Sequence, residues 1–422
     1  MKQSGIDWIG EIPDDWKINQ LSQIVSQVKN KNTGLKENNL LSLSYGKIKR
    51  KNINTNDGLL PASFDGYNII TDGDIVLRLT DLQNDHTSLR VGRATEQGII
   101  TSAYTTLHPV DYNNSKYLYY ILHSFDLKKG FYGMGSGVRQ GLNYDEVKTL
   151  KVPLPPKATQ QRIAEYLDSK CTQIDSIIEE SKKSIEEYKA WKQSVIFEAV
   201  TGKNLNCKKK DSGIEWIGEI PENYKLIRLK FLLKEKLQYG ANSSGIEFTS
   251  DLPRYIRITD IKDSKTLYDE NKLSLSEEDA KDYILDDNDI LFARSGATSG
   301  KCFIYRKEIG KATFAGYLIR AKIDETKLLP NFLVLYTMTK AYEEWKNQVC
   351  IQATIQNISA EKYVNLIVPL PPLPEQESIA KMLDSKCAQI DSLIAEKESL
   401  IADLTEYKKS LIFEVVTGKR SV

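Results

Sequence analysis

The sequence predicts an α+β protein: two α/β domains separated and joined by two long helices, which pair as an antiparallel coiled coil around a pseudo-two-fold internal repeat. Three observations predict this fold. The chain repeats itself over about half its length, the repeated phrases lie at the ends of each half, and the middles of the two halves do not match. A repeat unit this long indicates a duplicated module rather than a stack of short repeats.

The repeated phrases fix the register of the duplication. Residues 4–16 (SGIDWIGEIPDDW) recur as residues 212–224 (SGIEWIGEIPENY), an offset of 212 − 4 = 208. VPLPP begins at Val152 and again at Val368, an offset of 368 − 152 = 216, and the later phrases LDSKC-x-QIDS and IFE-x-VTGK keep that offset. The second middle is therefore a net eight residues longer (216 − 208 = 8). The expected boundaries are an α/β domain at 1–157, a helix at 158–203, an α/β domain at 204–373 and a helix at 374–422.

Each repeat ends in a predicted helix of 44 residues, at 158–201 and 374–417. Such a helix is about 65 Å long. Both follow an L-P-P phrase and stop at a glycine, Gly202 or Gly418, as helix ends require. Their apolar residues alternate in steps of three and four, which is typical of a coiled-coil seam. An alternative is that each helix packs only on its own domain.

Composition sets limits on the function. The chain of 422 residues is 41% hydrophobic and 27% charged, with a net charge of +1. This balance is typical of a soluble globular protein, and any basic surface has to be local. The five cysteines form no C-x-x-C pair, which fits a reducing compartment. There is no apolar run of membrane-spanning length. We expect a cytoplasmic protein with no membrane segment.

The two middles look like distant copies of one fold with different loops. DGDIVLR at residues 72–78 parallels DDNDILFAR at residues 286–294, so Arg78 and Arg294 are expected at matching strand ends. Other basic, amide and hydroxyl side chains lie near glycines around them. Arginine and lysine neutralise phosphates, and arginine, glutamine and asparagine can read base edges. The alternative for each of these side chains is an ordinary solvated surface group. The candidate DNA-binding residues are Lys47, Lys49, Arg50, Arg78, Arg90, Arg93, Ser136, Arg139, Gln140, Arg254, Arg257, Arg294, Ser295, Lys301, Gln352, Thr354 and Gln356.

Motifs for catalysis are missing. The segment GATSGKC at residues 296–302 has three residues between its glycines, not the four of a phosphate-binding loop, and it ends in cysteine. The three histidines, His86, His108 and His123, have no metal-ligand spacing. We therefore expect no catalytic residue, no metal site and no bound cofactor.

These phrases, in this order, resemble the specificity subunits of type I restriction–modification systems, and the resemblance covers the whole chain. It implies that the two middles are target recognition domains, each reading one half of an asymmetric bipartite site in double-stranded DNA. It further implies that the helices space the two domains and bind two copies of a methylation subunit, through which restriction subunits join. Catalysis, S-adenosylmethionine, ATP and Mg²⁺ would then belong to the partner subunits.

Two other classes of function remain open: a stand-alone DNA-binding regulator and a protein-binding scaffold. A docking surface for two copies of one partner predicts matched exposed residues on both helices, which a regulator does not need. The candidate pairs for such a surface are Gln160 with Gln376, Asp168 with Asp384, Lys170 with Lys386, Gln173 with Gln389, and Asp175 with Asp391.

Overall fold

The computed structural model describes residues 1–53, 61, 63–82, 84–85, 87–134, 141–296, 298–350 and 357–422. The chain divides into two compact units. Unit 1 comprises residues 1–182 and 398–422, and unit 2 comprises residues 183–397. Each unit therefore contains one α/β domain and a part of both long helices, α3 (Lys157–Thr201) and α8 (Leu373–Val416).

Unit 1 is built on a four-stranded antiparallel sheet. Its strand order is β4 (Val25–Gln27), β11 (Thr105–Pro109), β8 (Ile75–Leu77), β9 (Val91–Arg93). The remaining strands form antiparallel pairs: β1 (Lys2–Gln3) with β2 (Glu11–Ile12), β3 (Lys17–Gln20) with β12 (Lys151–Leu154), β5 (Leu41–Ser44) with β6 (Lys47–Arg50), and β7 (Asn68–Ile70) with β10 (Gly98–Ile100). The helical elements are η1 (Leu21–Gln23), η2 (Tyr112–Asn114), α1 (Ser115–Leu127), η3 (Gly130–Gly133) and α2 (Tyr144–Val147).

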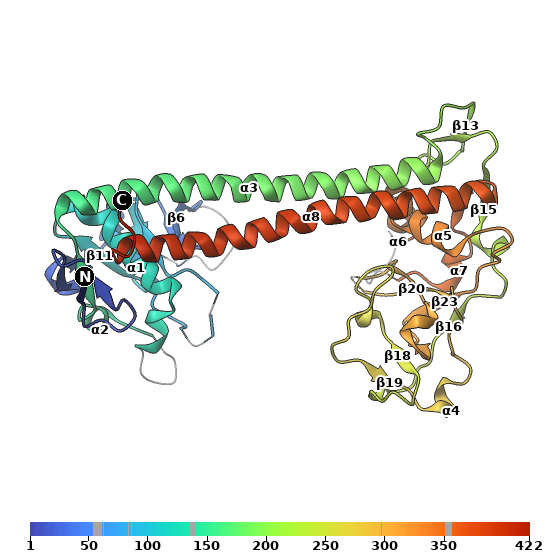
Figure 1. Ribbon diagram of the computed structural model, residues 1–422, viewed down its shortest axis with the longest axis horizontal. Coiled ribbons are helices and arrows are strands. Elements are labelled where there is room, and N and C mark those ends of the chain that lie inside the picture. The colour runs from blue at the N-terminus through green and yellow to red at the C-terminus, as the bar shows by residue number, and fades with distance from the viewer. Residues whose placement is uncertain are drawn as a thin grey trace. The chain divides into compact units, whose positions relative to one another are not determined.

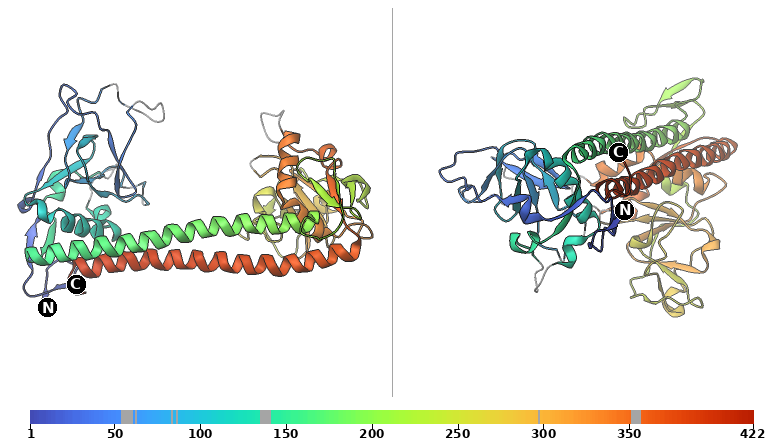
Figure 2. Two further views of the ribbon diagram at one scale, coloured as in Figure 1. Left: turned by 90° about the horizontal axis from the view of Figure 1, so that it is seen from above. Right: turned by 60° about the vertical axis from the view of Figure 1, so that its left-hand side comes forward.

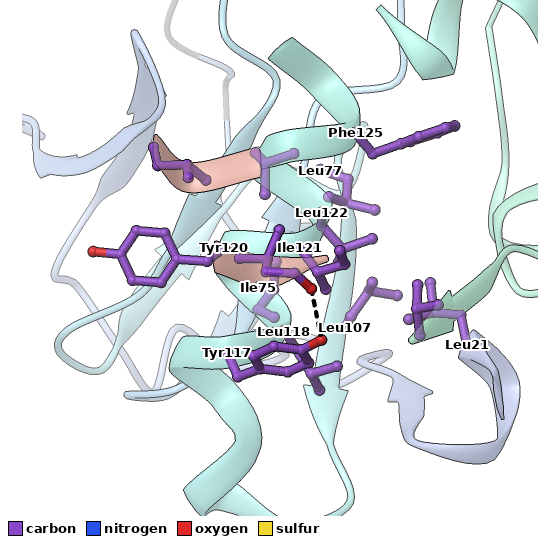
Figure 3. Close-up of a cluster of buried hydrophobic side chains, with 14 of the residues drawn as sticks. Leu21, Ile75, Leu77, Leu107, Tyr117, Leu118, Tyr120, Ile121, Leu122 and Phe125 are labelled. Carbon is purple, nitrogen blue, oxygen red and sulfur yellow. Dashed lines mark hydrogen bonds between the residues drawn. The ribbon is translucent and has the colours of Figure 1, made fainter. Parts of the chain in front are cut away.

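The core of unit 1 lies between helix α1 and the sheet. Apolar residues on α1, among them Leu118, Ile121 and Leu122, face Ile75 on β8 and Leu107 on β11 (Figure 3). The same cluster continues into both long helices through Leu167 of α3 and Leu411 of α8.

Unit 2 repeats this plan. Its main antiparallel sheet has the order β16 (Gln238–Tyr239), β23 (Leu318–Ala321), β20 (Ile290–Ala293), β21 (Cys302–Ile304), which matches the first sheet strand for strand. A second sheet has the order β17 (Ile246–Glu247), β19 (Leu273–Ser274), β18 (Arg254–Ile256), β22 (Ala312–Phe314). The other elements are β13 (Lys209–Asp211), β14 (Glu219–Pro221), β15 (Lys225–Arg228), β24 (Ile367–Leu370), η4 (Leu229–Phe231), η5 (Ile258–Asp260), η6 (Lys307–Ile309), α4 (Glu277–Ala280), α5 (Pro330–Thr337), α6 (Lys340–Cys350) and α7 (Ala360–Tyr363).

The long helices begin and end within one residue of the predicted bounds. Gly202 and Gly418, just beyond the ends, have left-handed φ angles of 70° and 73°, as a helix-terminating glycine requires. A Cβ at Gly202 would lie 2.5 Å from Pro221, and one at Gly418 would lie 2.4 Å from Pro13. These prolines belong to the repeated I-P phrases, so the conserved phrases of the frame pack against each other. Within the described residues, no helix is long and apolar enough to cross a bilayer.

Within each unit the two helices run side by side and antiparallel, as predicted (Figures 1 and 2). In unit 1 the early part of α3 packs on the end of α8, and in unit 2 the end of α3 packs on the start of α8. Two lysines that occupy seam positions, Lys192 and Lys408, each reach an aspartate on the opposite helix. Lys408 Nζ lies 2.6 Å from Asp175 Oδ1, and Lys192 Nζ lies 2.6 Å from Asp391 Oδ1. These two ion pairs are related by the repeat and favour this antiparallel register.

The Lys408–Asp175 pair provides a test of that register. Lys408→Asp should destabilise the chain by about 1 kcal/mol, because two carboxylates replace a partly exposed ion pair, and lower Tm by about 2–4 °C. Adding Asp175→Lys to the same chain should restore most of the loss. The measurement is thermal unfolding of the parent, both single variants and the double variant. A double variant no more stable than Lys408→Asp alone would show that this pair does not support the register.

Candidate nucleic-acid interface

Arg78 and Arg294 occupy matching strand ends, as predicted. Arg78 is the first residue after β8, and Arg294 is the first residue after β20. The register differs by one position. Ile75 is the first residue of β8, which pairs with β11, and Ile290 is the first residue of β20, which pairs with β23. Arg78 comes three residues after Ile75, whereas Arg294 comes four residues after Ile290. The two side chains therefore enter different surroundings.

Arg90 of unit 1 is fully buried. Its guanidinium donates hydrogen bonds to the carbonyls of Arg78 (3.2 Å), Thr80 (2.7 Å) and Asp81 (3.2 Å), among others, and its Nε donates to the hydroxyl of Tyr132 (3.0 Å). These bonds hold the segment that follows β8. No part of the side chain is left to meet a ligand, which corrects the expectation that Arg90 contacts DNA directly.

Three further arginines of unit 1 are paired with carboxylates. Arg78 lies 3.6 Å from Asp85, Arg93 lies 3.2 Å from Asp72, and Arg50 Nε donates to Glu96 Oε1 at 2.9 Å. The hydrogen bond from Arg50 lowers the pKa of Glu96, and hydrogen bonds from Ser88 hold the pKa of Asp85 far below its usual value. Both carboxylates are therefore ionised at neutral pH and compete with any phosphate for these arginines.

Lys47 and Lys49 differ from these arginines. Both are exposed on β6 and, among the described residues, neither has an ion-pair partner. They are two positions apart on one strand, so they share a face. In unit 1 these two lysines are therefore the candidate cations that are available to an external anion.

Unit 2 also contains both arginines that are paired within the fold and a cation that is not. Arg254 is buried and donates to Asp269 (3.0 Å) and to the carbonyl of Tyr268 (2.5 Å). Arg257 donates to Asp260 (2.7 Å) and to the carbonyl of Asn271 (2.8 Å). Both arginines stabilise the turn regions of the second sheet, and their charges are already compensated. The sequence alone did not distinguish them from free cations.

Arg294 has a different environment. Its guanidinium carbon lies 5.1 Å from the centre of the Tyr239 ring. Within the described part of the chain it has no ion-pair partner, and its buried Nε has no hydrogen-bond partner. Its backbone N–H donates to the carbonyl of Tyr317 (3.0 Å), whose side chain is 63% exposed. Ser295 and the exposed Lys301 lie beside it.

This cluster includes two tyrosines that sequence reasoning missed, Tyr239 and Tyr317. Strand pairing brings them to Arg294 from segments far apart in the chain, and nothing marks them among the 22 tyrosines of the sequence. A cation stacked on an aromatic ring beside a second exposed ring can meet both the phosphates and the faces of bases. The candidates Ser136, Arg139, Gln140, Gln352, Thr354 and Gln356 lie outside the described residues.

Most of the matched polar residues on the helices have partners within the chain. Gln160 and Gln376 are buried and donate to Pro155 (2.7 Å) and Pro371 (2.8 Å). Asp168 and Asp384 accept hydrogen bonds from Lys116 (2.7 Å) and Lys265 (2.8 Å), each within its own unit, while Asp175 and Asp391 form the seam ion pairs. The matching of these residues therefore reflects internal packing and is not evidence for docking. Lys170, Lys386, Gln173 and Gln389 are exposed.

A second set of residues, four of them matched between the two helices, faces solvent. On α3 and α8 the exposed large apolar side chains each lie one position before a seam position, which is apolar after Ile177, Leu393 and Leu400 and is a lysine after Trp191 and Tyr407. Ile177 corresponds to Leu393 (393 − 177 = 216), and Trp191 corresponds to Tyr407 (407 − 191 = 216).

We call these residues the apolar shoulders. Because the helices are antiparallel, the unit 1 shoulder combines Ile177 with Leu400 and Tyr407, and the unit 2 shoulder combines Trp191 with Leu393. Each shoulder thus has an aliphatic residue from one helix and an aromatic residue from the other, at positions related by the repeat. Trp191 is 51% exposed and Tyr407 is 47% exposed.

The described residues contain no group of three or more His, Cys, Asp or Glu side chains that could hold a metal ion. The described surface carries Lys47, Lys49 and Arg294 without ion-pair partners, the rings of Tyr239 and Tyr317 near a strand end, and apolar side chains on the helices.

Comparisons with known proteins agree with this fold. A family model described as "Type I restriction modification DNA specificity domain" matches twice, at residues 13–187 and 209–401. The MjaVIII specificity subunit of Methanocaldococcus jannaschii, a type I restriction enzyme component, is 23% identical over 97% of this chain and 93% of its own length. The EcoKI specificity subunit of Escherichia coli is 24% identical over 67% of this chain and 62% of its own length.

Solved structures share the fold. A chain from a study of complex assembly and conformational transition in the type I R-M system aligns with a TM-score of 0.73 at 14% identity, covering 97% of this chain and all of that one. The HsdS subunit from Thermoanaerobacter tengcongensis aligns with a TM-score of 0.52 at 15% identity, covering 97% and 98% of the two chains. The two family matches together span most of the sequence, and the chain belongs to the family of type I restriction–modification specificity subunits.

Proposed function

We propose that this chain reads an asymmetric, bipartite target in double-stranded DNA, one half through each recognition domain, and carries two copies of a methylation subunit on its paired helices. Residues 1–157 and 204–373 form the recognition domains, and residues 158–203 and 374–422 form the spacer helices. Restriction subunits join through the methylation subunits. The chain itself is non-catalytic, works in the cytoplasm, and leaves S-adenosylmethionine, ATP and Mg²⁺ to its partners.

The observation that carries the DNA-reading part is the difference between two matched strand ends. The sheets have the same strand order, yet unit 1 offers the lysines Lys47 and Lys49, while unit 2 offers Arg294 over the ring of Tyr239, with the exposed Tyr317 joined to Arg294 by a backbone hydrogen bond. A lysine is a point charge suited to phosphate, whereas the planar guanidinium of arginine can form a bidentate contact with guanine. Different chemistry on one frame supports the reading of two different half-sites.

The apolar shoulders support the docking part. Two surfaces built from repeat-related residues fit two copies of one partner, and an exposed apolar strip on a helix pair fits the apolar face of a partner helix. A stand-alone regulator would not need such strips. A protein-binding scaffold would not need a half-buried arginine whose guanidinium has no ion-pair partner among the described residues.

Arg294→Ala should weaken recognition of one half of the target only. If Arg294 pairs with a guanine, discrimination at that base pair should fall by about 5- to 150-fold, equivalent to about 1–3 kcal/mol. The measurement is methylation by the reconstituted complex on duplexes that carry single substitutions in each half. Arg257→Ala is the matched control, because Arg257 is a half-buried arginine of the same unit whose charge is already paired.

The salt dependence separates the two possible roles of Arg294. If it holds a phosphate, Arg294→Ala should weaken binding to all duplexes evenly and reduce the slope of log K against log salt by about one. An Arg294→Ala complex with the parent's affinity, salt slope and base preference would refute the assignment of Arg294 to the DNA interface.

The shoulders should be separable by mutation. Trp191→Glu with Leu393→Glu should remove one methylation subunit, and Ile177→Glu with Tyr407→Glu should remove the other. Losing the burial of one such side chain costs about 1.5–3 kcal/mol, so each pair should weaken its site by at least 10-fold. Native mass spectrometry gives the stoichiometry. Gln173→Glu with Gln389→Glu is the control for added charge, and an unchanged 2:1 complex for both apolar pairs would place the docking surface elsewhere.

A further inference from the structure

We propose that the β5–β6 hairpin of unit 1 is a ribbon that enters a groove of double-stranded DNA, with the ring of Tyr45 at its tip packed against the DNA and Lys47 and Lys49 on the phosphates. This rests on the proposed function, because it takes unit 1 to be a DNA reader. The proposed contact differs in kind from that of Arg294 at the strand end of unit 2, because it is made by an aromatic side chain exposed on a tight turn.

The tip of the hairpin has a specific turn geometry. Ser44 pairs with Lys47, so Tyr45 and Gly46 form a two-residue turn, and their φ angles are 48° and 75°. Positive φ at both positions is the signature of a type I′ turn, whose first position favours Asn, Asp or Gly. A tyrosine there is disfavoured, because its Cβ crowds the backbone in the left-handed region.

Burial within the described protein contributes little to offset that cost. Tyr45 is 79% exposed, more than any other large apolar side chain in the described residues. An aromatic ring kept in a disfavoured backbone conformation and directed into solvent indicates selection for an external contact. Sequence reasoning picked out Lys47 and Lys49 but passed over the tyrosine two residues before them.

The two faces of the hairpin are sharply different. Leu41, Leu43 and Ile48 pack inward in a cluster with Ile70 and Val76. A Cβ at Gly92 of β9 would lie 2.5 Å from Leu43, which shows how closely the hairpin sits on the sheet. The opposite face carries Ser42, Ser44, Lys47 and Lys49. These four residues offer hydroxyl and ammonium groups, which suit a polyanion. Lys47 also lines a hollow that contains Asp72 and Asp168, but these two carboxylates are paired with Arg93 and Lys116.

The dimensions suit duplex DNA. The major groove of B-DNA, about 12 Å wide, admits a two-stranded β-ribbon. Lys47 and Lys49 are separated by about 7 Å along the strand, so each can neutralise a different phosphate. The apolar inner face fixes the ribbon to the domain before binding, so little conformational entropy is lost on contact.

Tyr45→Asn gives opposite effects on stability and binding. It creates Asn-Gly, the favoured type I′ pair, and should raise the Tm of the free protein. It should also weaken binding of the complex to its target by about 10-fold, because an aromatic ring that packs on DNA is lost. Tyr45→Phe keeps the ring and should stay within about threefold of the parent. Lys47→Ala with Lys49→Ala should reduce the salt slope by about 1.8.

Leu35→Asn is the matched control. Leu35 is another exposed apolar residue of unit 1 with a left-handed φ of 53°, and it lies outside the hairpin. Its replacement should raise Tm as Tyr45→Asn does and leave DNA affinity unchanged. This separates relief of backbone strain from loss of the aromatic contact.

The experiment uses the complex reconstituted with methylation subunits and a duplex carrying the target mapped from the parent's own methylation pattern. The duplex contains 2-aminopurine at one position at a time. A fluorescence change confined to the half read by unit 1, present for the parent and for Tyr45→Phe and lost for Tyr45→Asn, is the expected result.

Two results would overturn the proposal. One is a Tyr45→Asn complex that binds with the parent's affinity and the parent's fluorescence pattern. The other is loss of a methylation subunit from that variant, which would make the hairpin a protein-docking element. In either case site-specific methylation by the parent would still stand, whereas a parent complex that methylates without sequence preference would remove the proposed function itself.

Discussion

The antiparallel pairing of α3 and α8 is the interaction on which the rest of this structure depends. The core of unit 1 contains Leu167 and Leu411, one from each helix, and the core of unit 2 contains Ile196 and Leu383. Neither recognition domain completes its core without both helices. In each unit a lysine of the seam is paired with an aspartate of the other helix. Apolar burial therefore stabilises the pairing of the two helices, and the ion pairs favour one register.

The dependence of each core on both helices explains why certain phrases are the same in the two repeats. The repeated I-P phrase places Pro13 against Gly418 and Pro221 against Gly202, so the start of each recognition domain packs on a helix end. The matched aspartates Asp168 and Asp384 bind a lysine from the domain of their own unit. Residues of the frame are held in common because they contact each other, while the segments around the strand ends differ in sequence between the halves.

Charge compensation separates the candidate site residues. Arginines that already have a carboxylate or several carbonyls as partners, such as Arg90 and Arg257, serve the fold. Arg294, with only an aromatic ring beside its guanidinium among the described residues, and the exposed Lys47 and Lys49 keep their charge available to a ligand. This division also explains how a protein with a net charge of +1 can meet DNA: several arginines are compensated within the fold, while Lys47, Lys49 and Arg294 have no ion-pair partner among the described residues.

The fold was largely predictable from sequence, and the site only in part. Helix bounds follow from heptad spacing and from terminal glycines, which are local signals, and the strand before Arg78 follows from its run of β-forming residues after the Asp72-Gly73 turn. The burial of Arg90 could not be read in this way, because it depends on carbonyls of the segment after β8 and on Tyr132, 42 residues away. Tyr239 reaches Arg294 through strand pairing, which has no local signature. The apolar shoulders were not predicted from the sequence, because the exposure of these side chains depends on where the second helix lies.

The central claim is that one conserved frame holds two independent readers. Its most direct test is to replace residues 17–151 with the corresponding segment of a related specificity subunit, keep both long helices, and map the methylated bases across a genome with the chain's own methylation subunits. The account predicts a target in which one half and the spacer are unchanged and the other half is new. A target in which both halves change together, or in which neither does, would contradict it.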